Sequence, residues 1–99
     1  MDIHYEFNGV RFIWDVDKAA SNLRKHDGIR FEQAATVFFD PFFCLVDASR
    51  NDEARDAVIG YDSFGRLLFV VHIEYDGDCI RLISARKAVS EERKDYDAG

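Results

Sequence analysis

The sequence predicts an α+β domain in which two N-terminal helices and one C-terminal helix surround a mainly antiparallel β-sheet. Helical spacing of apolar residues is found in two segments before Pro41, and a helix-capping sequence begins at Ser90. Between them, short apolar runs alternate with turn sequences, which is typical of strands. Helices gathered around such a sheet define the α+β class.

A first strand is expected over about Phe7–Trp14, because Val10, Phe12 and Trp14 alternate onto one face. A helix over Lys18–His26 follows, with Asp15 or Asp17 as its N-cap and Gly28 after its end.

A second helix is expected over Phe31–Phe39. Its apolar side chains recur at the spacing of one helical face, which must pack on the core: Phe31, Ala34, Ala35 and Phe38. Asp40-Pro41 ends it, because proline lacks the backbone donor and disfavours a helical residue before it.

Four strands are expected next, over Phe42–Val46, Ala57–Tyr61, Arg66–Glu74 and Cys79–Ala85. The connection Asp62–Gly65 predicts a hairpin, and a second turn is expected over Tyr75–Asp78. Leu67–Val71 is apolar on both faces, which indicates a central strand buried on both sides. Ser90 is the expected N-cap of the last helix, with Glu91 and Glu92 near its positive end.

Length and composition narrow the class of protein. A chain of 99 residues with 47% hydrophobic content closes one core, so residues 1–99 are expected to form one domain. No apolar run approaches the ~20 residues of a membrane span, and no secretory signal is visible. Cys44 and Cys79 stand alone, which favours reduced thiols in the cytoplasm and no metal site. No cofactor is expected.

Charge is unevenly distributed. The chain has 13 Lys and Arg against 19 Asp and Glu, which argues against phosphate binding by the whole surface. Residues 81–94 hold five basic residues against two acids, so a small, shaped phosphate site remains possible there.

Arg81 lies in the middle of a predicted strand, where an unpaired charge is costly to bury. Either its guanidinium binds a substrate phosphate, or it pairs with Glu74 or Glu53. Arg86, just past the strand, would bind substrate with it, or stay solvated or contact a partner.

Lys25 and His26 end the first predicted helix, where the helix dipole favours cations. They are candidates for proton transfer and charge stabilisation, although capping alone also explains them. Arg66 begins a strand beside a turn and is a further candidate for the reacting phosphate, with an ion pair to Asp62 as the alternative.

Two further residues are candidates for substrate binding. His72 lies on an apolar strand face, where a hydrogen-bonded core histidine is the favoured interpretation. Glu74 is a candidate base, and more readily a carboxylate that orients an arginine.

Several motifs occur together in a fixed order. They are Phe12-x-Trp14-Asp15-x-x-Lys18-Ala19-x-x-Asn22-x-x-Lys25-His26, Phe31-Glu32-x-Ala34-x-x-Val37-Phe38-x-Asp40-Pro41, Arg55-x-x-x-Ile59-Gly60, Gly65-Arg66-Leu67-Leu68, Val70-Val71-x-x-Glu74, Ile80-Arg81-Leu82-Ile83-Ser84-Ala85-Arg86 and Glu92-Arg93-x-x-Tyr96. In this order the chain resembles the BrnT family of toxins from type II toxin–antitoxin systems. One departure is Asp27, which stands between His26 and Gly28 where the family reads Lys-His-Gly. It either favours the protonated histidine or lengthens the loop.

The resemblance implies a RelE-like fold and a metal-independent endoribonuclease that inhibits translation, with Lys25, His26, Arg66 and Arg81 as the catalytic set. It also implies a BrnA-like ribbon-helix-helix antitoxin that forms a hetero-oligomer with the toxin and makes the operator DNA contacts. The rival hypothesis is a non-catalytic module that binds an antitoxin within a repressor complex. Direct DNA binding is disfavoured, because no basic recognition helix is present.

Overall fold

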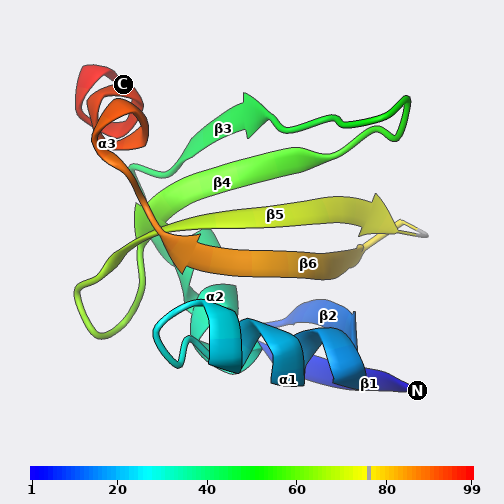
Figure 1. Ribbon diagram of the computed structural model, residues 1–99. Coiled ribbons are helices and arrows are strands. Elements are labelled where there is room, and N and C mark those ends of the chain that lie inside the picture. Colours follow the sequence, from blue (N-terminus) through cyan, green and yellow to red (C-terminus); the bar gives the residue numbers. More distant parts are fainter. Residues whose placement is uncertain (76) are drawn as a thin grey trace.

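The computed structural model describes residues 1–75 and 77–99. Within them, six strands form one mixed sheet in the order β1-β2-β6-β5-β4-β3 (Figure 1). All neighbouring strands are antiparallel except β2 and β6, which are parallel. The elements are β1 (Asp2–Phe7), β2 (Val10–Asp15), α1 (Val16–Lys25), α2 (Phe31–Ala35), the 3₁₀ helix η1 (Thr36–Phe39), β3 (Cys44–Asp47), β4 (Asp56–Tyr61), β5 (Leu67–Tyr75), β6 (Cys79–Lys87) and α3 (Ser90–Ala98). None of these helices is long and apolar enough to cross a membrane.

The α+β class is correct, but the predicted arrangement with two N-terminal helices is wrong, and the mainly antiparallel sheet includes one parallel pair. The chain opens with a β-hairpin and not with a helix. The second expected helix is represented by α2, which has five residues and lies in the middle of the chain. The remainder of the expected Phe31–Phe39 helix is the 3₁₀ helix η1. β-Branched Thr36 and Val37 are stiff, and the nearby Pro41 prevents a longer α-helix, so the segment tightens into a short 3₁₀ turn.

The first hairpin contains a strand that the sequence analysis did not predict. β1 pairs with β2 along its whole length, from Asp2 opposite Asp15 to Phe7 opposite Val10. Asn8 and Gly9 connect them with φ of 51° and 80°, as a two-residue type I′ turn requires. The hairpin that the sequence did predict, over Asp62–Gly65, is confirmed by the hydrogen bond from Gly65 N–H to the Asp62 carbonyl at 3.0 Å. The predicted turn over Tyr75–Asp78 includes Asp76, which lies outside the described residues.

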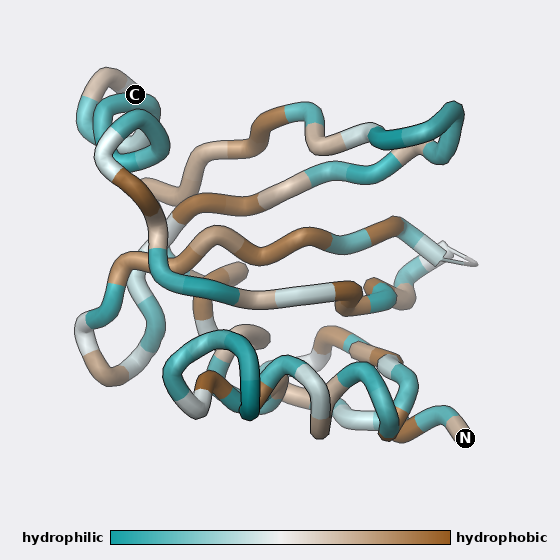
Figure 2. Tube along the Cα trace, in the orientation of Figure 1, coloured by the Kyte–Doolittle hydropathy of each residue, from teal (hydrophilic) through white to brown (hydrophobic). Residues whose placement is uncertain are grey.

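The core lies between one face of the sheet and α2 with η1. Phe31, Ala34 and Ala35 are buried in it, as predicted. Because η1 winds more tightly than an α-helix, Val37 is 0% exposed, whereas Phe38 is only partly buried. The apolar run in β5 is clear in Figure 2, yet it is fully buried on one face only. Its other face, with Phe69 and Val71, is half-buried and open to a groove.

The two longer helices begin differently. Asp15 caps α1, since its carboxylate accepts hydrogen bonds from the Asp17 and Lys18 N–H groups at 3.1 and 3.0 Å. Ser90 does not cap α3 as expected. It is the first helical residue, and the Glu92 carboxylate accepts the Val89 N–H at 2.9 Å instead.

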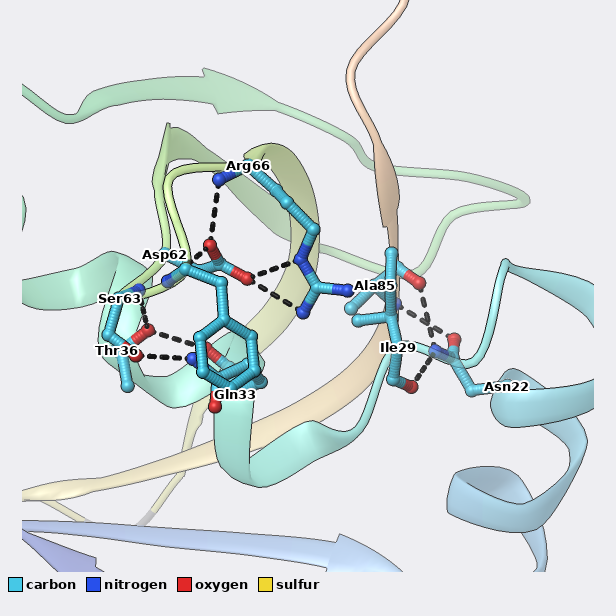
Figure 3. A network of polar contacts seen from close by, with 9 residues as sticks. Asn22, Ile29, Gln33, Thr36, Asp62, Ser63, Arg66 and Ala85 are labelled. Carbon is cyan, nitrogen blue, oxygen red and sulfur yellow. Dashed lines mark hydrogen bonds and ion pairs between the residues drawn. The ribbon is translucent and has the colours of Figure 1, made fainter.

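Along part of β6, a side chain takes the place of a neighbouring strand. β6 pairs with β2 only from Cys79 to Arg81, so its later residues have no strand on that side. The side chain of Asn22, 4% exposed on α1, donates to the Ala85 carbonyl and accepts the Ala85 N–H, both at 2.9 Å. It also donates to the Ile29 carbonyl at 3.1 Å (Figure 3). One amide therefore joins α1, the following loop and β6.

We expect Asn22→Ala to lower the free energy of unfolding by about 2–4 kcal/mol, because it leaves several buried backbone groups without partners. Urea unfolding followed by circular dichroism measures this. Arg24→Ala, at an exposed position of the same helix, is the control and should change stability by at most about 0.5 kcal/mol. Equal stability of the two variants would contradict the assignment.

His72 is a core residue, as the favoured interpretation held. Its ring lies 4.9 Å from that of Phe38, its Nδ1 is 3.3 Å from the Val70 carbonyl, and burial lowers its pKa below 6.5. The unfolded chain therefore binds this proton more readily, and the associated stability is present above pH ~6.5 and lost as the pH falls below it.

We expect His72→Gln to reduce the loss of stability between pH 7 and 5.5, measured by urea unfolding at each pH. His4→Gln, which removes an exposed histidine from β1, should keep the wild-type slope. If both variants retained that slope, His72 would not be the group responsible.

Candidate nucleic-acid interface

A basic groove lies on the sheet face opposite the core. It consists of two adjoining hollows of about 290 and 370 Å³ that share Arg50, Arg55 and Ser84. Their remaining lining residues are Lys18, Ser21, Asn22, Lys25, His26, Ala48, Ser49, Phe69, Val71, Ile83 and Arg86. We call this set the basic groove.

Three elements supply its positive charge: α1, the connection between β3 and β4, and β6. Five Lys and Arg side chains and one histidine line it, and among the described residues no Asp or Glu does. In a chain with a formal net charge of −6, this is a strong local concentration of cations. Such a lining attracts polyanions, above all the phosphates of a nucleic acid.

The α1 wall is positioned by Asn22. Lys18, Asn22 and Lys25 lie four and three residues apart and therefore share one face of the helix. His26 follows as the C-cap, with its N–H donating to the Asn22 carbonyl at 2.9 Å. Asp27 has a φ of 55° and lies exposed in the turn that follows α1.

The opposite wall is a small hairpin extension between β3 and β4. Arg50 and Glu53 exchange backbone hydrogen bonds of 3.1 and 2.9 Å around a turn in which Asn51 and Asp52 have φ of 53° and 64°. The Glu53 carboxylate accepts a hydrogen bond from Arg55 Nη2 at 2.6 Å. The hydrogen bonds of this turn therefore hold Arg50 and Arg55 at the groove.

Arg86 enters from β6. Its guanidinium lies 4.3 Å from the centre of the Phe69 ring and forms two hydrogen bonds of 2.8 Å with Glu92. The Glu92 hydrogen bonds raise the pKa of Arg86 despite its partial burial, so the side chain is a permanent cation.

The structure brings three of the predicted site residues together in the groove: Lys25, His26 and Arg86. It places the other four elsewhere. Arg66 forms an ion pair with buried Asp62, with its Nε and Nη2 both 2.8 Å from Oδ2 (Figure 3), which was the alternative interpretation. His72 lies in the core, and Glu74 is exposed on β5.

Arg81 pairs with neither of its expected carboxylates. Its Nη2 lies 2.9 Å from Asp2 on the unpredicted strand β1, and its guanidinium lies 5.1 Å from the Tyr75 ring centre. The catalytic roles of Arg66 and Arg81, and substrate binding by His72 and Glu74, stay predictions.

Sequence reasoning missed three of the cations that line the groove: Lys18, Arg50 and Arg55. Arg50 and Arg55 stand in an acidic segment, which concealed them. The Asn51-Asp52 pair is a two-residue turn signal that would have placed the flanking residues on one hairpin. Among the described residues, no group of three or more His, Cys, Asp and Glu is arranged to hold a metal ion.

Chemically, the basic groove offers cations for several phosphates and adjacent amine and imidazole groups for proton transfer. No curated protein matches the sequence. A family model does, described as the ribonuclease toxin BrnT of type II toxin–antitoxin systems, and it covers residues 14–92. That range includes every lining residue of the basic groove. The chain belongs to the BrnT family of ribonuclease toxins from type II toxin–antitoxin systems.

Proposed function

We propose that the basic groove is the ribonuclease site and that it cleaves RNA internally without a metal ion, in the manner of RelE-like toxins. The observation that carries this proposal is the concentration of five Lys and Arg side chains and His26 in one groove. Inhibition of translation follows from the loss of messenger RNA.

Metal-free RNA cleavage needs a proton acceptor for the 2′-hydroxyl, a proton donor for the leaving 5′-oxygen and a cation beside the phosphorane. His26 is suited to proton transfer, since an imidazole ring carries both a proton-donating and a proton-accepting nitrogen. Lys25, at the end of α1, supplies a compact positive charge beside it. Lys18, Arg50 and Arg55 then hold the flanking phosphates.

Arg66 and Arg81 have a different role in this proposal. Each is engaged by a carboxylate, Asp62 or Asp2, outside the basic groove. We assign them to stability: Arg66 neutralises a buried aspartate in the β4–β5 hairpin, and Arg81 ties β6 to the N-terminal strand.

The family implies an antitoxin partner. We propose that it is a ribbon-helix-helix protein that makes the operator DNA contacts itself, and that residues 1–99 act with it as one toxin domain in the cytoplasm. An acidic surface outside the groove suits a basic segment of such a partner.

We expect the purified chain to cleave a labelled mixed-sequence RNA in EDTA, and His26→Gln to slow cleavage at least about 100-fold, the usual contribution of a general acid or base. Lys25→Ala should also slow it, while His4→Gln serves as the matched control. Cleavage at the wild-type rate by folded His26→Gln would refute the assignment. If the folded wild type cleaved nothing, with or without ribosomes, the non-catalytic binding module would be favoured.

RNA affinity separates the two sets of arginines. In the His26→Gln background, Arg50→Gln and Arg55→Gln should each weaken binding and lower the slope of log affinity against log salt by about one. Arg81→Gln is the discriminating variant, and we expect it to leave that slope unchanged while lowering thermal stability. An equal loss of slope in Arg81→Gln would return Arg81 to the site.

A further inference from the structure

The C-terminal helix contributes little to the core. Every residue of α3 is at least partly exposed. At its far end, the Tyr96 hydroxyl donates to Asp40 at 2.7 Å and the Tyr96 ring packs against Tyr61. At its near end, the first turn brings Glu92, whose side chain is 15% exposed, against Arg86 of the basic groove.

The Arg86 guanidinium is held on several sides. The Phe69 ring lies on one face at 4.3 Å, Glu92 accepts from Nη1 and Nη2 at 2.8 Å, and the Lys87 carbonyl accepts from Nη1 at 3.2 Å. Among the described residues, Nε–H has no hydrogen-bond partner. The planar group therefore has one edge engaged and the Nε–Nη2 edge available for bidentate binding of a phosphate.

Glu92 is itself fixed. Its Oε1 also accepts the Val89 N–H at 2.9 Å, where the positive end of the helix dipole favours a carboxylate. The connection from β6 is short, and the Ala88 N–H donates to the Leu67 carbonyl at 2.9 Å. Burial alone would raise the pKa of Glu92, but hydrogen bonds from Arg86 and Val89 lower it below 4.5, so the carboxylate is charged at neutral pH.

We propose that Glu92 is a positioning residue for RNA binding: from the first turn of α3 it orients Arg86 so that the free edge of the guanidinium meets a substrate phosphate. This inference rests on the proposed function of the basic groove. Through this carboxylate it makes α3 a functional part of the site.

Two physical models predict opposite signs for Glu92→Gln. If charge alone mattered, the removal of a carboxylate near a cationic groove would strengthen RNA binding. If Glu92 orients Arg86, its removal weakens binding, because the guanidinium loses its fixed geometry. Glu91→Gln is the matched control: it changes the net charge equally, but Glu91 is exposed and its one ion pair within the described part of the chain is with Lys94 at 3.4 Å.

The experiment measures binding of a mixed-sequence 2′-O-methyl RNA oligonucleotide, which cannot be cleaved through its 2′-oxygen, by fluorescence anisotropy. We expect Glu92→Gln to weaken binding about five- to tenfold and Glu91→Gln to leave it unchanged or slightly tighter. In an Arg86→Gln background, Glu92→Gln should have no further effect. Equal or tighter binding by Glu92→Gln, or an undiminished effect without Arg86, would overturn the proposal.

A second variant and a second readout distinguish the positioning role of Glu92 from a general unfolding of α3. Arg86→Lys keeps the charge and the helix but not the planar edge, and it should weaken binding as much as Glu92→Gln. ¹⁵N NMR of the Arg86 Nε–Hε group should show restricted guanidinium rotation in the wild type and in Glu91→Gln, and free rotation in Glu92→Gln. An unchanged signal would overturn the positioning role. Failure of the wild type to bind the oligonucleotide would refute the proposed function, and the NMR result would still decide whether Glu92 fixes Arg86.

Discussion

The amide of Asn22 does for the free edge of β6 what a neighbouring strand does elsewhere in the sheet. It forms hydrogen bonds with the N–H and the carbonyl of Ala85 and with the Ile29 carbonyl in the loop after α1. Since β2 leaves β6 after Arg81, this side chain closes the gap and joins α1 to the sheet. The positions of Lys25 and His26 in the basic groove depend on it.

Arginines in this molecule serve two purposes, distinguished by where their carboxylate partners lie. Arg66 and Arg81 are paired away from the groove, where they secure a hairpin and the N-terminal strand. Arg55 and Arg86 pair with Glu53 and Glu92, which are not among the lining residues of the groove. A carboxylate that binds one edge of a guanidinium fixes its direction and leaves the other N–H groups for a second acceptor.

Features set by neighbouring residues were predictable from the sequence, and features set by distant ones were not. The strands from β4 to β6, the helix after Asp15 and the Asp62–Gly65 hairpin follow from local periodicity and turn chemistry. The parallel pairing of β2 with β6 has no local signal. The Arg81–Asp2 pair joins residues 79 positions apart, so a mid-strand arginine could only be recognised as needing some partner. Lys25, His26 and Arg86 were found by their chemistry, whereas Arg50 and Arg55 needed the hairpin geometry.

Under the proposed function, the concentration of charge also affects how RNA approaches the basic groove. Five of the 13 Lys and Arg residues line the basic groove, which leaves eight on the rest of a chain with 19 Asp and Glu. The molecule is therefore an electric dipole with one positive pole. An RNA strand is repelled by most of its surface within roughly a Debye length, about 8 Å at physiological salt, and is drawn in only at that pole. The orientation of the RNA is thus selected before any contact forms. Rising ionic strength weakens both the repulsion by the acidic surface and the attraction by the basic groove.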